Sequence, residues 1–173
     1  MAPARPVALV VMGVSGSGKS SVGRAIAAAT GYDFVDADDL HPPANVAKMR
    51  GGTPLEDDDR WPWLAAVANV MREHLDAGRG VVVACSALKR AYRDRLRSAG
   101  PGVRFVHLHG SEELMAKRLS RRNDHFFDPR LLASQFAALE APDPSGEEGV
   151  LVVDAAASIA TIVGDVAAAL AAG

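Results

Sequence analysis

The sequence predicts an α/β protein built on a parallel sheet. Short apolar runs alternate with helical patterns along the whole chain of 173 residues. Two of these runs, VVVA at residues 81–84 and VLVV at 150–153, are apolar at every position, as expected of strands that helices cover on both faces. The first run leads directly into a glycine-rich segment that precedes an amphipathic helix. These three observations indicate a sheet between two helical layers.

The elements can be placed in chain order from these patterns. The predicted strands are residues 7–12, 33–35, 81–84, 103–108 and 150–153. The predicted helices are residues 20–29, 43–49, 61–76, 88–98, 112–121, 129–139 and 159–171. The last helix is alanine-rich, but its larger apolar residues recur at helical spacing, which favours packing against the sheet. With no repeat and no linker, we expect one domain over residues 1–173.

Composition narrows the possible partners and location. A net charge of −2 and a pI near 6.2 provide no basic surface for duplex nucleic acid or a membrane surface. Cys85 is the only cysteine, which suits a reducing cytosol, and we interpret it as a small buried residue. The apolar run near the start leads into the glycine-rich loop, and no stretch reaches the roughly 18 apolar residues of a membrane span. We therefore expect a cytoplasmic protein with neither nucleic-acid nor membrane partners.

The segment GVSGSGKS at residues 13–20 fits the spacing GxxxxGK[ST] of a phosphate-binding loop. Its glycines let backbone N–H groups converge on a triphosphate, and the following helix offers its positive end to the anion. Lys19 can then reach the β and γ phosphates, and the Ser20 hydroxyl can hold Mg²⁺. A glycine-rich turn without a ligand would need the Lys-Ser pair to occur by coincidence. The predicted nucleotide-binding residues here are Gly13, Val14, Ser15, Gly16, Ser17, Gly18, Lys19, Ser20 and Ser21.

Two carboxylates follow the second predicted strand, where open α/β sheets bind ligands. Strand-like alternation places Asp36 and Asp38 on the same side. A kinase needs one carboxylate near Mg²⁺ and another to orient or deprotonate the attacking hydroxyl, and this pair can divide those tasks. His41 can hydrogen-bond a polyol, or else serve as a turn or capping residue. Arg60 can bind a substrate carboxylate, or else pair with the neighbouring aspartates.

The third predicted strand ends without an aspartate, so Mg²⁺ must rest on Ser20 and Asp36. After that strand, Lys89 and Arg93 stand four residues apart, so both can reach an anionic acceptor from one helical face. An equally good interpretation is that these cations lie on a solvent-exposed helix face.

Arg118 and Arg122 also stand four residues apart and share a helical face. A small phosphotransferase needs a cationic segment that closes over the γ-phosphate and excludes water, and we expect this lid over approximately residues 118–140. Solvated helix arginines are the alternative. Gln135 and Glu140 are possible anchors of the lid.

Several motifs in this order and spacing resemble those of one family, the gluconokinases of the shikimate-kinase-like group of P-loop small-molecule kinases. The matching segments are MGVSGSGKS, DADDLHP, G-x-P-L-x-D-x-D-R-x-P-W-L, CSALK-x-x-Y-R-D-x-L-R, HFF and S-Q-F-x-x-L-E-x-P. The resemblance covers nearly the whole chain. It implies ATP-dependent phosphorylation of D-gluconate at its 6-hydroxyl with Mg²⁺, a three-layer α/β/α fold with five parallel strands in the order 2-3-1-4-5, and a homodimer.

The resemblance also implies roles for individual residues. It assigns phosphate and Mg²⁺ to Lys19, Ser20 and Asp36, and the acceptor hydroxyl to Asp38. The remaining matches are His41, Arg60, Lys89 and Arg93 near gluconate, and Arg118 and Arg122 in the lid. We expect Lys19, Asp38 and Arg122 to take part in catalysis.

Two alternatives remain. One is a kinase of another small hydroxy acid such as shikimate, although the CSALK segment lacks the glycine-rich turn of shikimate kinases. The other is a nucleotide-binding regulator without an acceptor.

Overall fold

The computed structural model describes residues 5–121 and 128–173. Five strands form one parallel sheet in the order β2-β3-β1-β4-β5, as the family resemblance implies. They are β1 (Ala8–Met12), β2 (Asp33–Asp36), β3 (Val81–Ala84), β4 (Val103–His109) and β5 (Val150–Asp154). The central strand β1 pairs Val10 with Val83 of β3 and with Phe105 of β4. All five predicted strands are therefore confirmed, with ends that shift by one residue.

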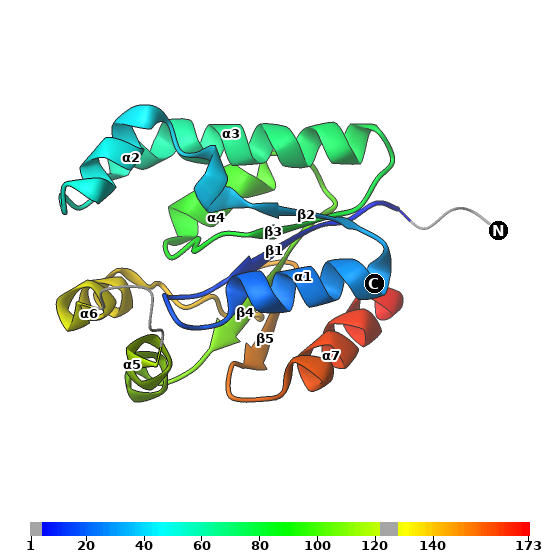
Figure 1. Cartoon of the computed structure of the whole chain (residues 1–173). Coiled ribbons are helices and arrows are strands. Elements are labelled where there is room, and N and C mark those ends of the chain that lie inside the picture. The colour runs from blue at the N-terminus through cyan, green and yellow to red at the C-terminus, as the bar shows by residue number, and fades with distance from the viewer. Residues whose placement is uncertain (1–4, 122–127) are drawn as a thin grey trace.

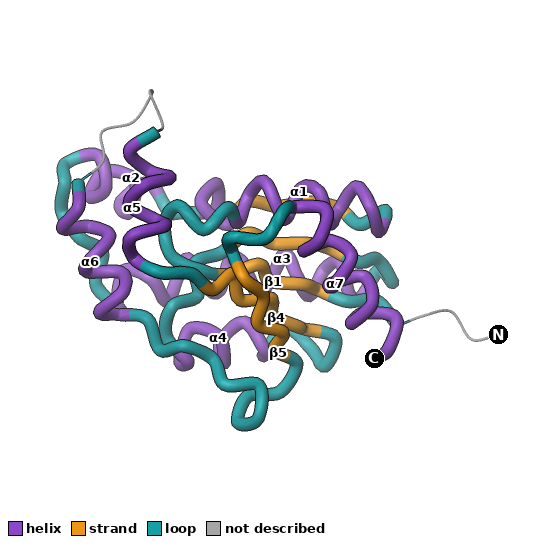
Figure 2. Tube along the Cα trace, turned by 90° about the horizontal axis from the view of Figure 1, so that it is seen from below, coloured by secondary structure: helices purple, strands orange, loops and turns teal. Residues whose placement is uncertain are grey.

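Helices cover both faces of this sheet, which confirms the three-layer prediction (Figure 1). Their bounds are α1 (Lys19–Thr30), α2 (Pro43–Arg50), α3 (Asp57–Asp76), α4 (Arg90–Arg97), α5 (Glu112–Ser120), α6 (Pro129–Ala138) and α7 (Ile159–Ala172), with a 3₁₀ helix η1 (Ala37–Leu40) after β2. The pair α3 and α4 packs on one face, and the pair α1 and α7 on the other (Figures 1 and 2). Helices α2, α5 and α6 lie toward the left end in Figure 1.

The core consists of two apolar clusters separated by the sheet. Val10 and Phe105 meet Trp63 and Leu64 of α3 on one side, and Leu9 joins α1 and α7 on the other. Every residue of β1 is buried, which explains why its sequence is apolar at each position. Burial of each large side chain contributes about 1.5–3 kcal/mol. No helix within residues 5–121 or 128–173 has the length and apolar character needed to cross a bilayer.

Two helix starts differ from the sequence prediction by more than one residue. Helix α3 begins at Asp57, four residues before the expected start, because the Asp59 carboxylate accepts a hydrogen bond from the Glu56 N–H at 2.9 Å and caps the helix. Acidic residues in the first turn also complement the positive end of the helix. Helix α4 begins at Arg90 instead of residue 88, because Ala87 has a left-handed φ of 46° and Lys89 is extended.

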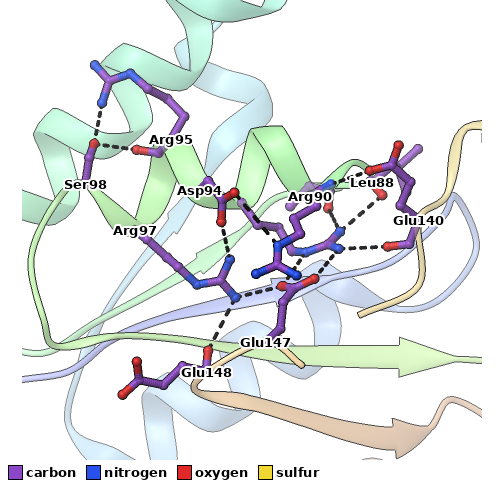
Figure 3. A network of polar contacts seen from close by, with 11 residues as sticks. Leu88, Arg90, Asp94, Arg95, Arg97, Ser98, Glu140, Glu147 and Glu148 are labelled. Atoms are coloured by element: carbon purple, nitrogen blue, oxygen red, sulfur yellow. Dashed lines mark hydrogen bonds and ion pairs between the residues drawn. The ribbon is translucent and has the colours of Figure 1, made fainter. Parts of the chain in front are cut away.

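A buried ion-pair network attaches α4 to the segment that follows α6 (Figure 3). Arg93 and Glu147, only 1% and 4% exposed, form two hydrogen bonds of 2.9 and 2.6 Å, and Arg97 Nη2 lies 2.7 Å from Glu147 Oε2. The Arg93 guanidinium also donates to the main-chain oxygens of Ala87, Leu88 and Glu140. Burial opposes ionisation of Glu147, but the bonds from both arginines outweigh it and lower the pKa to about 2.

We expect Glu147→Gln to lower the free energy of unfolding by about 3 kcal/mol at pH 7, because it leaves the buried Arg93 charge unpaired. Since the folded-state pKa is depressed, this contribution is present above the unfolded carboxyl pKa of about 4.3 and is lost as pH falls toward 2. Urea unfolding of both proteins at several pH values measures the difference. The matched control is Glu148→Gln on the exposed neighbour. Equal effects of the two substitutions would contradict a structural role for this pair.

Candidate active site

The loop between β1 and α1 forms a compact turn of the kind the motif predicts. Gly13 and Gly16 have φ values of 155° and 84°. A Cβ atom on Gly16 would lie 3.0 Å from the Met115 carbonyl oxygen, and one on Gly13 would lie 2.7 Å from the Ser17 Oγ. Both positions therefore require glycine, because a side chain would collide with α5 or with the loop itself. Lys19 begins α1, and its Nζ donates to the Val14 carbonyl oxygen at 3.0 Å.

The loop presents the other predicted nucleotide-binding residues in one short segment. Val14 and Ser17 are buried beneath it, Gly18 adopts a left-handed conformation before α1, and Ser21 is exposed in the first turn of that helix. Gly18 leads directly into α1, so the amino end of this helix adjoins the loop, where its positive partial charge favours an anion.

A hydroxyl and a carboxylate meet where α1 approaches the end of β2. Ser20 Oγ donates to Asp36 Oδ2 at 3.0 Å, and the main-chain N–H of Asp38 donates to Asp36 Oδ1 at 3.0 Å. Asp36 thus caps η1, and Asp38 belongs to that 3₁₀ turn. The predicted strand-like alternation of Asp36 and Asp38 is wrong, because β2 ends at Asp36. The turn nevertheless keeps both carboxylates near the loop.

Asp38 is the predicted acceptor-side carboxylate, and its side chain is 84% exposed. Its pKa is raised, first by desolvation and then by the negative charge of Asp36, while Lys19 and His41 oppose the rise. Because the carboxylate faces solvent, screening limits the size of this effect. Asp38 is therefore a stronger base than an ordinary aspartate and remains open to a ligand.

His41 lies beside Asp38 with its side chain only 4% exposed, and its Nε2 is 4.0 Å from Asp38 Oδ1. The imidazole stacks on Trp63, with ring centroids 4.1 Å apart and planes 15° apart. Burial lowers the pKa of His41, the Asp38 charge opposes this, and Arg60 adds to it. Trp63 is itself a buried core residue, so it gives the imidazole a fixed stacking surface.

Arg60 and Lys89 come together at the starts of α3 and α4. The Arg60 guanidinium carbon is 5.7 Å from the centre of the Tyr92 ring, and the Lys89 Nζ is 5.6 Å from it. Lys89 also lies 3.1 Å from Asp57 Oδ1, and the Tyr92 hydroxyl donates to the same carboxylate. Sequence reasoning singled out neither Asp57 nor Tyr92, because their association joins positions 35 residues apart.

The structure does not bring Arg93 to this cluster. The predicted shared face of Lys89 and Arg93 is wrong, because Lys89 precedes α4 in an extended conformation. Arg93 is instead buried against Glu147. The predicted catalytic residue Arg122 lies outside the described residues.

Two side chains attach α5 and α6 to the phosphate loop. Arg118 of α5 donates to the Gly16 and Ser17 carbonyl oxygens, at 3.4 and 3.3 Å, and also to the Ala155 carbonyl oxygen after β5. Gln135 of α6 accepts from the Ser15 N–H at 2.7 Å and donates to the Ser15 Oγ at 2.9 Å. These contacts connect both helices of the predicted lid region to the loop.

Cys85 follows β3 and is buried, as expected. Burial raises the pKa of its thiol to about 12. The thiolate is therefore unavailable as a nucleophile at neutral pH.

Comparisons with known proteins agree with this geometry. Residues 9–142 match a family model described as an AAA domain. The gluconokinase of Gluconobacter oxydans is 51% identical over 138 residues, which cover 80% of this chain and 78% of that protein. The thermoresistant gluconokinase of Escherichia coli is 43% identical over 145 residues, covering 84% and 82%. The crystal structure of a gluconokinase from Sinorhizobium meliloti 1021 superposes with a TM-score of 0.86 at 53% identity, covering 96% and 93% of the two chains.

We expect Gln135→Ala to loosen the attachment of α6, because it removes both hydrogen bonds to Ser15. Net losses of about 1 kcal/mol per bond, about 2 kcal/mol in all, predict roughly thirtyfold faster amide exchange in α6. Hydrogen exchange followed by mass spectrometry measures this effect. Ser134→Ala is the matched control, since the Ser134 hydroxyl donates within α6, to the Leu131 carbonyl oxygen. Unchanged exchange in the Gln135 variant would contradict the anchoring role.

Proposed function

This chain belongs to the gluconokinase family of phosphotransferases, and we propose that it transfers the γ-phosphoryl group of ATP to the 6-hydroxyl of D-gluconate, giving 6-phospho-D-gluconate and ADP. The observation that carries the proposal is the arrangement of Asp36, Asp38 and His41 beside the phosphate loop, at the carboxyl end of β2. Ligands of open α/β sheets bind at this position. A phosphate cradle and an acceptor pocket therefore adjoin each other.

The donor half consists of the loop, Lys19 and the Ser20–Asp36 pair. Among residues 5–121 and 128–173, no group of three or more His, Cys, Asp or Glu side chains is placed to hold a metal. Ser20 and Asp36, in contact at 3.0 Å, are the small oxygen set that Mg²⁺ takes together with waters and substrate phosphates. Bound there, Mg²⁺ would neutralise charge on the phosphate oxygens. Asp36 would orient the Ser20 hydroxyl and any bound water.

In the acceptor half, Asp38 orients the 6-hydroxyl and accepts its proton as the new O–P bond forms. Its raised pKa supports this role. Arg60 is our proposed partner for the gluconate carboxylate, because a guanidinium binds a carboxylate through two parallel hydrogen bonds. Lys89 extends the positive edge of the pocket, although Asp57 already engages its ammonium group. Arg93 takes no part in this proposal.

A coupled assay of ADP release with D-gluconate, other aldonic acids and shikimate decides among the candidate functions. The proposal expects release that depends on D-gluconate. A response to shikimate alone would favour the other hydroxy-acid kinase, and ATP binding without any acid-dependent release would favour a regulator. Closure of a lid over residues 118–140, the catalytic role of Arg122, the homodimer and the cytoplasmic location stay predictions.

We expect Asp38→Asn to lower kcat by a factor of roughly 10²–10⁴, the usual contribution of a positioned general base. In the unsubstituted enzyme, activity should fall as pH drops through the Asp38 pKa. Because this pKa is raised, the fall should occur at a pH above the ordinary aspartate pKa of about 3.9. The coupled assay across pH measures both effects. Asp39→Asn, an identical change at the exposed neighbouring residue, is the control. Near-normal kcat in the Asp38 variant would exclude it as the base.

Asp36→Asn should raise the Mg²⁺ concentration needed for half-maximal activity about tenfold, since a neutral amide oxygen attracts the cation less than a carboxylate does. Added Mg²⁺ should restore part of the activity. Asp33→Asn, at the opposite end of β2, is the matched control. If the Asp36 variant showed an unaltered Mg²⁺ dependence, the proposed metal site would be wrong.

A further inference from the structure

A buried asparagine lies behind the acceptor pocket, and the proposed function gives it no role. Asn45, in the first turn of α2, is 3% exposed. Its Nδ2 lies 2.8 Å from the main-chain oxygen of Asp59 and 3.2 Å from the Nδ1 of His41. A single amide nitrogen therefore contacts both the first turn of α3 and the imidazole beside Asp38.

The Asp59 contact determines which way the Asn45 amide points. A main-chain carbonyl oxygen can only accept a hydrogen bond, so the atom facing it must be the NH₂ group. The second hydrogen of that group is then directed at His41 Nδ1, which must accept it. A neutral imidazole with an accepting Nδ1 carries its proton on Nε2.

Packing also fixes the orientation of the His41 imidazole ring. It stacks on Trp63, and the Trp63 Nε1–H donates to the Ala37 carbonyl oxygen at 2.6 Å. The other ring nitrogen, Nε2, lies 4.0 Å from Asp38 Oδ1. The charged groups that act on the ring are Asp38, which favours its protonation, and Arg60, which opposes it. Asp59, whose main chain bonds Asn45, has its own carboxylate paired with Lys48 at 2.8 Å.

We propose that Asn45 is a positioning residue that fixes His41 as a neutral imidazole donating its Nε2–H to an oxygen of the phosphoryl acceptor. With Nδ1 occupied and Nε2 protonated, His41 offers no lone pair to the acceptor hydroxyl. The proton of the acceptor hydroxyl therefore passes to Asp38 and not to His41. The assignment of the acceptor rests on the proposed function, whereas the tautomer of His41 does not.

Nuclear magnetic resonance of the ¹⁵N-labelled full chain, without ligand, tests the tautomer directly. The expected spectrum of His41, assigned with a His41→Gln variant, shows protonation at Nε2 alone near pH 7. In Asn45→Asp the new carboxylate demands a proton on Nδ1, so the ring should become protonated there. In Asn45→Ala, which provides neither donor nor acceptor, both tautomers should appear. An Nδ1–H tautomer in the unsubstituted protein, or identical ring spectra in all three proteins, would overturn the proposal.

The pH profile of kcat/KM for D-gluconate supplies a second test. Asn45→Asp should raise the His41 pKa, because the carboxylate stabilises the imidazolium. Below that raised pKa the Nε2–H persists. Above it the neutral ring keeps its proton on Nδ1, so the donor is lost and kcat/KM should fall about tenfold as pH rises. The unsubstituted enzyme should show no such fall over the same interval.

Lys48→Met is the matched control, since it removes another contact between α2 and Asp59 without touching His41. Its pH profile of kcat/KM should match that of the unsubstituted enzyme. An alkaline fall in Lys48→Met equal to that of Asn45→Asp, or its absence from the Asp variant, would refute the positioning role. If the unsubstituted protein shows no gluconate-dependent ADP release, the proposed function fails, while the ring spectra still decide the tautomer.

Discussion

The hydrogen bond from Ser20 to Asp36 is the contact on which the arrangement of the site depends. It joins the first turn of α1 to the end of β2 at 3.0 Å. The same carboxylate caps η1 through the Asp38 N–H, and the Ala37 carbonyl of that turn accepts from Trp63, on which His41 stacks. The proposed donor and acceptor halves therefore share Asp36, which connects the first turn of α1 to η1.

Arginines show how tertiary partners determine the role of a residue type. Arg93 is enclosed by Glu147 and three carbonyl oxygens, Arg118 by carbonyl oxygens of the phosphate loop and of Ala155, whereas Arg60 lies over an aromatic ring. A guanidinium held by several acceptors stabilises the chain segments that supply them, and it cannot turn toward a ligand without leaving those acceptors unpaired. Arg60 lies over the Tyr92 ring and, among the described residues, is not enclosed by acceptors in this way, so its guanidinium suits a substrate carboxylate.

Much of the fold was predictable because apolar runs and glycine spacing are local signals. All five strands and the phosphate loop were placed within a residue or two, and the strand order came from the family resemblance. The sequence did not predict the starts of α3 and α4, the η1 turn or the burial of Arg93 against Glu147. They depend on the capping contact between Asp59 and Glu56, the left-handed Ala87 and a partner for Arg93 that is 54 residues away. Asn45 was missed because its orientation is set by a contact with the main-chain oxygen of Asp59, which no residue identity encodes.

Desolvation acts on Asp38 and His41 in opposite directions and thereby separates their roles. It raises the pKa of the carboxylate and lowers that of the imidazole, so desolvation opposes the charges that an ion pair would need, while the charge of each neighbour acts in the other direction. A charged pair would hold Asp38 against His41 and compete with the acceptor hydroxyl. With His41 neutral, the carboxylate stays 84% exposed, with its oxygen 4.0 Å from Nε2. In the proposed mechanism, that exposure would also let a proton taken from the acceptor leave to water, which would make Asp38 available for the next turnover.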